Sequence, residues 1–149
     1  MILLTTGLRI SAALSLTVSQ VNLKQWTLTI PPQDDKAKTG YVAGIAPDGR
    51  KVLRRLVREA VDGRLFPECL TRHAVYQSTR RLAHRHGIDF QGGAFNHALR
   101  HSFATTLVDN GTPIQVISAL LGHHDISTTQ IYAKVRDTAR RNAVDNLKF

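Results

Sequence analysis

The sequence predicts an α+β fold that is mainly α-helical, with one small antiparallel sheet in its N-terminal third. Most of the chain carries apolar residues three or four positions apart, which is typical of amphipathic helices. Only residues 26–46 contain two short segments rich in β-branched and aromatic side chains around a polar loop, the pattern of a β-hairpin. A chain of 149 residues with 42% hydrophobic content suits one domain with a buried core.

The N-terminal third contains the predicted sheet. Residues 1–20 are predicted to be helical, with a break at Gly7. Residues 26–30 are predicted to form a strand that a Pro-Pro pair ends, and residues 41–46 a returning strand. The polar segment 33–40 between them is then the lysine-bearing tip of a hairpin.

Capping residues and glycines divide the rest of the chain into predicted helices. The residues at which these helices are expected to begin are Asp48, Thr71, Phe95, Thr112, Asp125 and Asp137. The four residues from Thr112 have the form of a capping box with proline at the first helical position. Gly111 and Gly122 are expected to end the helices that precede them.

The chain is strongly basic, with a formal net charge of +9. A globular protein of this charge repels itself unless it meets a polyanion, so nucleic acid is the expected partner and an anionic membrane surface the second choice. The predicted helix over residues 71–86 gathers arginines on one face, which either contacts phosphate groups or is simply exposed to solvent. Cys69 is the only cysteine, and no apolar run approaches the roughly 18 residues of a membrane span. We therefore expect a cytoplasmic protein that binds double-stranded DNA and no membrane.

The predicted helix over residues 95–110 places basic side chains opposite its core face. At about 100° per residue, His97, Arg100 and His101 fall together on one side. The residues expected on the core face are Leu99, Ser102, Phe103, Thr106 and Leu107. Arginine binds phosphate oxygens with two parallel hydrogen bonds, and a neighbouring histidine donates a hydrogen bond or moves a proton near pH 7. An ordinary basic helix surface has the same pattern, so the interpretation depends on the residues that follow.

A histidine and a tyrosine follow at a suggestive spacing. Gly122 is predicted to end a helix and to expose His123 on the next turn, and Tyr132 lies nine residues later on a short helix. A tyrosine hydroxyl has a pKa near 10 and is a weak nucleophile unless cations surround it. His123, Arg100 and His97 are the candidates for those cations.

Three motifs resemble those of one enzyme family. Residues 6–11 (TGLRIS), residues 97–105 (HALRHSFAT), and LLGH at residues 120–123 followed by STTQIYAKV at residues 127–135 occur in order and at plausible spacing. They are similar to the active-site motifs of the tyrosine recombinases of the phage-integrase type. The resemblance covers nearly the whole chain, and it implies the fold of the tyrosine recombinase catalytic domain.

The resemblance implies six catalytic residues: Arg9, Lys38, His97, Arg100, His123 and Tyr132. The two arginines and His123 would hold the non-bridging oxygens of the scissile phosphate, and His97 would accept a proton or position the nucleophile. Tyr132 would attack phosphorus and form a 3′-phosphotyrosyl bond. Lys38, with Lys36 as the second candidate, would protonate the leaving 5′ oxygen. The implied function is site-specific DNA recombination, with self-association on DNA and without metal, nucleotide or other cofactor.

Two departures from the family pattern affect the expected activity. The family has an acidic residue three positions after the first arginine, and its carboxylate braces the active-site cations, whereas this chain has Ala12 there. Family members also carry a helical core-binding domain and further helices ahead of the first motif, whereas eight residues precede Arg9 here. We interpret residues 1–149 as a catalytic domain without the core-binding domain. The sequence leaves open a truncated remnant, a naturally short member and a fragment of a longer chain.

Two other functions compete with recombination. A truncated or inactive family member would bind DNA without transferring strands. His97 and His101 lie four residues apart, as in a helical zinc-hydrolase motif, but Ala98 stands in place of the general-base Glu. No convincing carboxylate ligand stands near these histidines, which argues against a zinc site. Ala12 and the missing N-terminal region support the inactive member, but all six catalytic positions are filled, which favours recombination.

Overall fold

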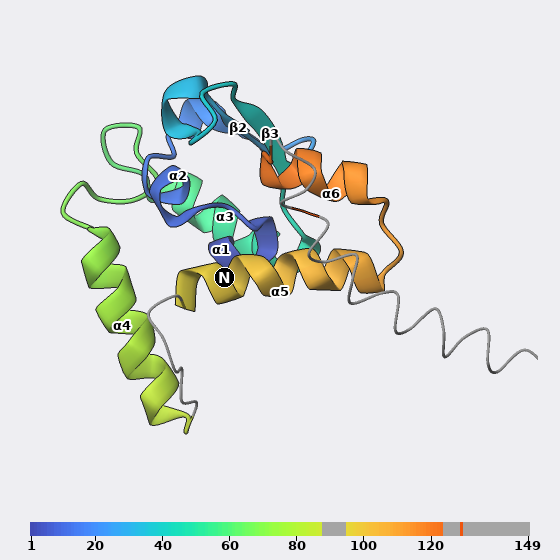
Figure 1. Cartoon of the computed structure of the whole chain (residues 1–149). Helices are drawn as coiled ribbons and strands as arrows, with labels where there is room; N and C mark the ends of the chain where they lie inside the picture. Colours follow the sequence, from blue (N-terminus) through green and yellow to red (C-terminus); the bar gives the residue numbers. More distant parts are fainter. Residues whose placement is uncertain (88–94, 124–128, 130–149) are drawn as a thin grey trace, which may run out of the picture.

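A computed structural model of the chain describes residues 1–87, 95–123 and 129. The helices and strands of this part are α1 (Ile2–Thr6), α2 (Ile10–Leu14), the 3-10 turn η1 (Val18–Gln20), β1 (Val21–Asn22), β2 (Thr27–Ile30), the 3-10 turn η2 (Pro32–Asp34), β3 (Tyr41–Gly44), α3 (Pro47–Arg58), α4 (Arg72–Arg85), α5 (Phe95–Asp109) and α6 (Ile114–Leu121). Figure 1 shows the sheet on one side of the fold and α5 on the other, with α1 to α3 between them. The predicted helices that begin at Asp125 and Asp137 lie outside the described residues.

The three strands form one antiparallel sheet in the order β1-β2-β3. Thr27 pairs with Gly44 and Ile30 with Tyr41, so the loop over residues 31–40 joins the two longer strands. The predicted α+β class and the hairpin are confirmed. The strand β1 was not predicted, because two residues are too few to show an alternating pattern.

Two apolar clusters build the interior. The larger one joins α1, α2, the sheet and α3 through buried side chains that include Leu8, Leu28 and Leu53. The smaller one lies between α5 and α6, and its buried members are Ala104, Val108, Ile117 and Leu121. None of the helices in the described part of the chain is long and apolar enough to cross a bilayer.

Gly7 lies where the two clusters meet. It ends α1 in the left-handed conformation, with φ 65°, as its predicted role as a helix break requires. A Cβ atom at Gly7 would approach the side chains of Phe103 and Leu121 at 2.5 and 2.8 Å, closer than real Cβ contacts. The segment that follows α1 is therefore pressed directly against α5 and α6.

The buried face of α5 differs from the predicted one. Its fully buried line is Arg100, Ala104 and Val108, whereas Ser102 and Thr106, expected in the core, are exposed. Phe103 and Leu107 are partly buried, as expected, and pack against the smaller cluster. The predicted core face was wrong by part of a turn because helical spacing placed Arg100 opposite it, whereas Arg100 is buried by its hydrogen bonds to the carbonyls of Gly7 and Leu121.

Two predicted helix starts also differ in detail. The N-cap of α3 is Ala46, followed by Pro47, so Asp48 lies inside the first turn instead of capping it. The N-cap of α6 is Pro113, which makes no side-chain capping bond, so the capping box expected from Thr112 does not form. Pro47 occupies the first position of α3, where its fixed φ is already close to the helical value and favours the start of the helix.

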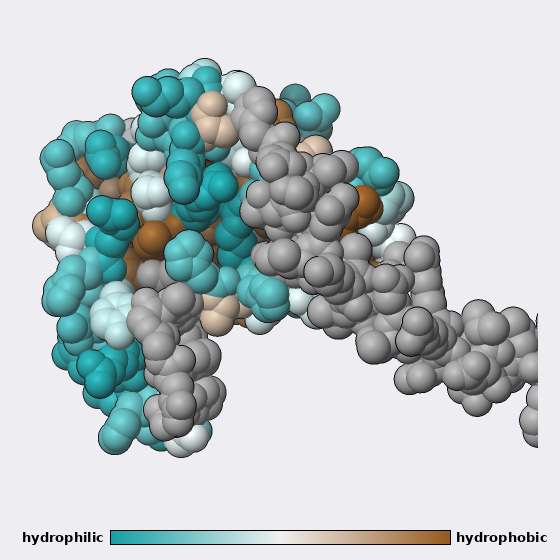
Figure 2. All heavy atoms as spheres, viewed as in Figure 1, coloured by the Kyte–Doolittle hydropathy of each residue, from teal (hydrophilic) through white to brown (hydrophobic). Residues whose placement is uncertain are grey.

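The helix α4 extends away from the rest of the fold (Figure 1). Thr71 caps it as predicted, because the Thr71 hydroxyl accepts a hydrogen bond from the Ala74 amide at 3.1 Å. Of its expected apolar line, Ala83 is buried but Leu82 is 55% exposed. The helix therefore packs against its neighbours through only a small apolar area. The rest of its surface is mostly hydrophilic, as the lower left of Figure 2 shows.

Candidate active site

Arg100 is the centre of the site and is almost fully buried, with 6% of its surface exposed. Its Nη1 donates to the carbonyl of Gly7 at 2.7 Å, and its Nη2 donates to the carbonyl of Leu121 at 2.7 Å. These carbonyls belong to the ends of α1 and α6, which lack helical partners for their last backbone groups. A guanidinium has five N–H donors, so it can join both helix ends and still bring its charge to a phosphate.

Arg9 lies two residues after Gly7, at the N-cap of α2. Its side chain is 26% exposed, and its Nη1 lies 3.5 Å from the Oδ1 of Asp35, on the loop between β2 and β3. The residue before it, Leu8, is fully buried in the larger cluster and anchors the backbone there. Arg9 is therefore held at the edge of the site, with its charge accessible to a ligand.

His123 follows directly after Gly122, which ends α6 in the left-handed conformation, as predicted. Its amide donates to the carbonyl of Ser118 at 2.9 Å, and its Nδ1 lies 2.8 Å from the hydroxyl of Thr129. A threonine hydroxyl that donates to Nδ1 leaves the proton on Nε2, where it is available to a phosphate oxygen. The ring orientation is thus set by a fully buried threonine.

The surroundings of His123 keep its ring neutral. Burial, together with the smaller effects of the charges of Arg100 and Arg9, lowers the pKa of His123 to about 4. The hydrogen bonds of Arg100 to the carbonyls of Gly7 and Leu121, which lie two residues from Arg9 and from His123, bring these three residues to one region of the fold. We expected His123 among the cations of the site, but at neutral pH it is a hydrogen-bond donor without charge.

Tyr41 is a site residue that the sequence did not indicate. It opens β3, its ring lies against Gly122, and its hydroxyl is buried. Burial raises the pKa of Tyr41, opposed by the charges of Arg100 and Arg9. In the sequence alone it is only an aromatic residue at a strand end. The same holds for Asp35 and Thr129, which lay unnoticed in a polar loop and inside the third motif.

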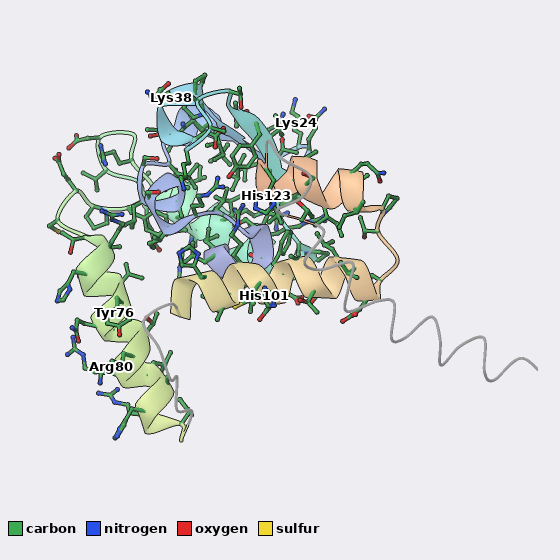
Figure 3. The ribbon with its side chains drawn as sticks, in the orientation of Figure 1. Lys24, Lys38, Tyr76, Arg80, His101 and His123 are labelled. Atoms are coloured by element: carbon green, nitrogen blue, oxygen red, sulfur yellow. The ribbon has the colours of Figure 1, made fainter. Side chains whose placement is uncertain are left out.

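The remaining predicted residues lie outside this group. His97 is exposed on α5, one turn before Arg100. Lys38 is exposed on the loop between β2 and β3, and Figure 3 shows it well away from His123, which lies beside the end of α6. Tyr132 falls outside the described residues. The structure thus brings together Arg9, Arg100 and His123, and it leaves His97 and Lys38 on neighbouring elements.

Comparison with known proteins identifies the family. Residues 1–139 match the phage integrase family. The chain belongs to the phage integrase family. It is 36% identical to the tyrosine recombinase XerD of Pseudomonas putida over 149 residues, covering 90% of this chain and 47% of the relative. It is 33% identical to XerD of Haemophilus ducreyi, covering 92% of this chain and 49% of the relative. The chain spans about half the length of these curated relatives.

Solved structures of this family have the same fold. The catalytic domain of bacteriophage HP1 integrase is 29% identical with a TM-score of 0.69, covering 99% of this chain and 82% of that one. The XerA recombinase is 26% identical with a TM-score of 0.77, covering 99% of this chain and 57% of that one. The expected fold of the tyrosine recombinase catalytic domain is therefore confirmed. Among the described residues, no three His, Cys, Asp or Glu side chains lie close enough together to hold a metal ion.

Proposed function

We propose that this chain cleaves and rejoins double-stranded DNA at specific sites through a 3′-phosphotyrosyl intermediate. The observation that carries the proposal is the convergence of Arg9, Arg100 and His123 from three elements on one place. Two fixed positive charges and a neutral hydrogen-bond donor suit a phosphodiester whose equatorial oxygens gain negative charge during attack. The family supports this reading, because the relatives described above are named tyrosine recombinases.

The proposed reaction needs only the chain's own side chains. The Oη of Tyr132 attacks phosphorus, and its proton passes to His97. The bond from phosphorus to the 5′ oxygen breaks, and that oxygen takes a proton from Lys38. The step is a transesterification and involves no oxidation or reduction. The phosphotyrosyl bond conserves the energy of the cleaved phosphodiester, so a second 5′-hydroxyl can attack it and rejoin the strand. Arg100 supports the attack because its two carbonyl partners fix its charge before the phosphate arrives.

The proposed partner is the DNA backbone. The formal net charge of +9 favours binding to a polyanion, and α4 exposes Arg72, Arg80, Arg81 and Arg85 to solvent. Figure 3 shows Arg80 projecting from α4 on the side away from the rest of the fold. We further propose that copies of the chain associate on the DNA and that the protein works in the cytoplasm.

Covalent capture of DNA tests the proposed function. The substrate is a pool of nicked duplexes with randomised flanks, in which cleavage releases a short strand and removes the 5′-hydroxyl that would reverse the reaction. We expect an adduct that survives boiling in detergent and forms equally well with excess chelator. Tyr132→Phe abolishes it, whereas Tyr76→Phe, a matched change on α4, preserves it.

Two outcomes would contradict the proposal. If the wild-type chain binds the duplexes but yields no adduct, it is a DNA-binding protein without strand transfer. If Tyr132→Phe still forms the adduct, another residue is the nucleophile. Tyr41, whose hydroxyl is buried within the charges of Arg9 and Arg100, is then the first residue to replace.

A further inference from the structure

Asp35 is a buried carboxylate at the base of the turn that carries Lys38. Its side chain is 1% exposed, and its Oδ2 accepts a hydrogen bond from the Thr39 hydroxyl at 3.2 Å. The backbone amides of Ala37 and Thr39 also donate to this carboxylate. The Lys38 amide donates to the Asp35 carbonyl at 3.0 Å, so one residue organises the whole turn.

The same carboxylate holds Arg9. The Nη1 of Arg9 lies 3.5 Å from the Oδ1 of Asp35, so one oxygen faces the arginine and the other faces the turn. Within residues 1–87, 95–123 and 129, the other carboxylate paired with an arginine is Glu59, which pairs with Arg55 on the exposed surface of α3. Asp35 is thus the acid among them that offsets charge at the site, where Arg9 and Arg100 would otherwise repel each other.

Position 12 does not provide this acid. The resembling family has a carboxylate there that braces the active-site cations, but Ala12 is 2% exposed and lies in the larger apolar cluster. The brace for Arg9 comes instead from a different element, the loop between β2 and β3. That loop also carries Lys38, the proposed proton donor.

We propose that Asp35 is a positioning residue that ties Arg9 to the turn of Lys38, so that one carboxylate sets both the phosphate clamp and the proton donor. This inference rests on the proposed function. The carboxylate is suited to the role because it stays ionised. Burial raises the pKa of Asp35, but the hydrogen bonds from Ala37 and Thr39 and the charge of Arg9 together hold it below its usual value.

Two substrates separate the two halves of this role. One is the ordinary nicked duplex from the covalent capture, and the other carries sulfur in place of the bridging 5′ oxygen. A thiol has a pKa of about 8.5, so it leaves as a thiolate without a proton donor, and its cleavage does not need Lys38. Cleavage of the sulfur substrate still needs the guanidinium of Arg9 to stabilise the negative charge on the non-bridging oxygens. Lys38→Ala is the reference for the loss of the proton donor, because it should lower the cleavage rate of the oxygen substrate and leave that of the sulfur substrate unchanged.

We expect Asp35→Asn to lower the single-turnover cleavage rate of the oxygen substrate by up to about 100-fold. The cleavage rate of the sulfur substrate should fall less but should still fall, because this substrate does not need the proton from Lys38 but does need a correctly placed Arg9. Asp34→Asn removes the same charge from the same loop and should leave both rates near wild type. The ratio of the two rates is taken on one preparation, so a partly unfolded sample does not alter it.

Two results would overturn the inference: an oxygen-substrate rate in Asp35→Asn equal to wild type, or an equal loss on both substrates. Hydrogen exchange of the Ala37 and Thr39 amides gives a test that needs no cleavage. Exchange should accelerate in Asp35→Asn and not in Asp34→Asn, and unchanged exchange would refute the proposed turn anchor. A wild-type chain that forms no adduct would count against the proposed function alone, because the exchange test still decides the role of Asp35.

Discussion

The guanidinium of Arg100 donates to the carbonyl of Gly7 at 2.7 Å, across 93 residues of sequence. Its second donor reaches the carbonyl of Leu121, so the proposed phosphate ligand also fastens the ends of α1 and α6 to α5. A charge is costly to bury unless it is hydrogen-bonded, and here the helix ends supply the acceptors. Stability and catalysis therefore depend on the same side chain.

Replacing Arg100 should consequently reduce stability as well as adduct formation. Arg100→Ala leaves two buried carbonyls without partners, and we expect a loss of about 3 kcal/mol in the free energy of unfolding. Arg100→Lys should recover only part of this, because a point charge on a flexible stem cannot span both carbonyls. Denaturant unfolding measures both variants. Wild-type stability in Arg100→Ala would mean that these hydrogen bonds are not what joins the helices.

A second prediction concerns Gly122, whose φ is 61° and whose missing side chain leaves room for the ring of Tyr41. Gly122→Ala combines a left-handed alanine with a clash against that ring, so it should destabilise the fold and displace His123. Gly63→Ala is the matched control, because Gly63 has φ 72° and a Cβ atom at this position would meet nothing within 4 Å. We expect the control to lose about 1 kcal/mol and Gly122→Ala clearly more. Equal losses would show that contact with Tyr41 is unimportant.

The sequence predicted those features of the fold and of the site that depend on local patterns of residues. Hydrophobic spacing and glycines located the hairpin, α5 and the end of α6, because these features are local. The motifs pointed to Arg9, Arg100 and His123, but the sequence did not show that Arg100 is buried. Its acceptors are carbonyls of residues 7 and 121, and backbone groups leave no mark in a sequence.

Asp35 was missed for a related reason. An aspartate in a polar loop is ordinary, and its importance arises only when folding brings Arg9 to it from 26 positions away. Tyr41 likewise gained its place from the pairing of β3 with β2 and from the contact with Gly122. Charge and polarity in the sequence thus predicted the chemistry of the site better than the burial of its members.

The titration of His123 gives a third prediction. Its ordinary pKa is 6.5 and its pKa in the folded chain is about 4, so the unfolded chain binds more protons between these values. The contribution of neutral His123 to stability is therefore complete above pH 6.5 and is lost as the pH falls towards 4. His123→Asn should lose less stability than wild type over this window in denaturant unfolding at several pH values. Parallel pH profiles for the two proteins would contradict the low pKa.

Thr129 should control the orientation of the same ring. Thr129→Val keeps the shape of a fully buried side chain and removes the hydroxyl that lies 2.8 Å from Nδ1 of His123. The imidazole then loses its partner, so adduct formation should slow while DNA affinity stays near wild type. Thr39→Val, which removes a hydroxyl on the hairpin loop, should leave the ring nitrogen signals of His123 unchanged in NMR spectra, whereas Thr129→Val should shift them. Unshifted signals in Thr129→Val would mean that the contact does not persist in solution.

The last prediction concerns the basic surface and how its contribution depends on salt. Binding to duplex DNA releases counterions, so the logarithm of the affinity should fall linearly with the logarithm of the salt concentration. Arg80 is exposed on α4, and Arg80→Gln should reduce the steepness of this line by about 1 if it meets one phosphate. Arg55→Gln removes the same charge from α3, where Arg55 faces Glu59 at 3.9 Å, and should leave the slope unchanged. A fluorescence anisotropy titration at several salt concentrations gives all three slopes. Equal slopes for wild type and Arg80→Gln would remove α4 from the DNA-binding surface, and a flat line for the wild type would refute backbone binding altogether.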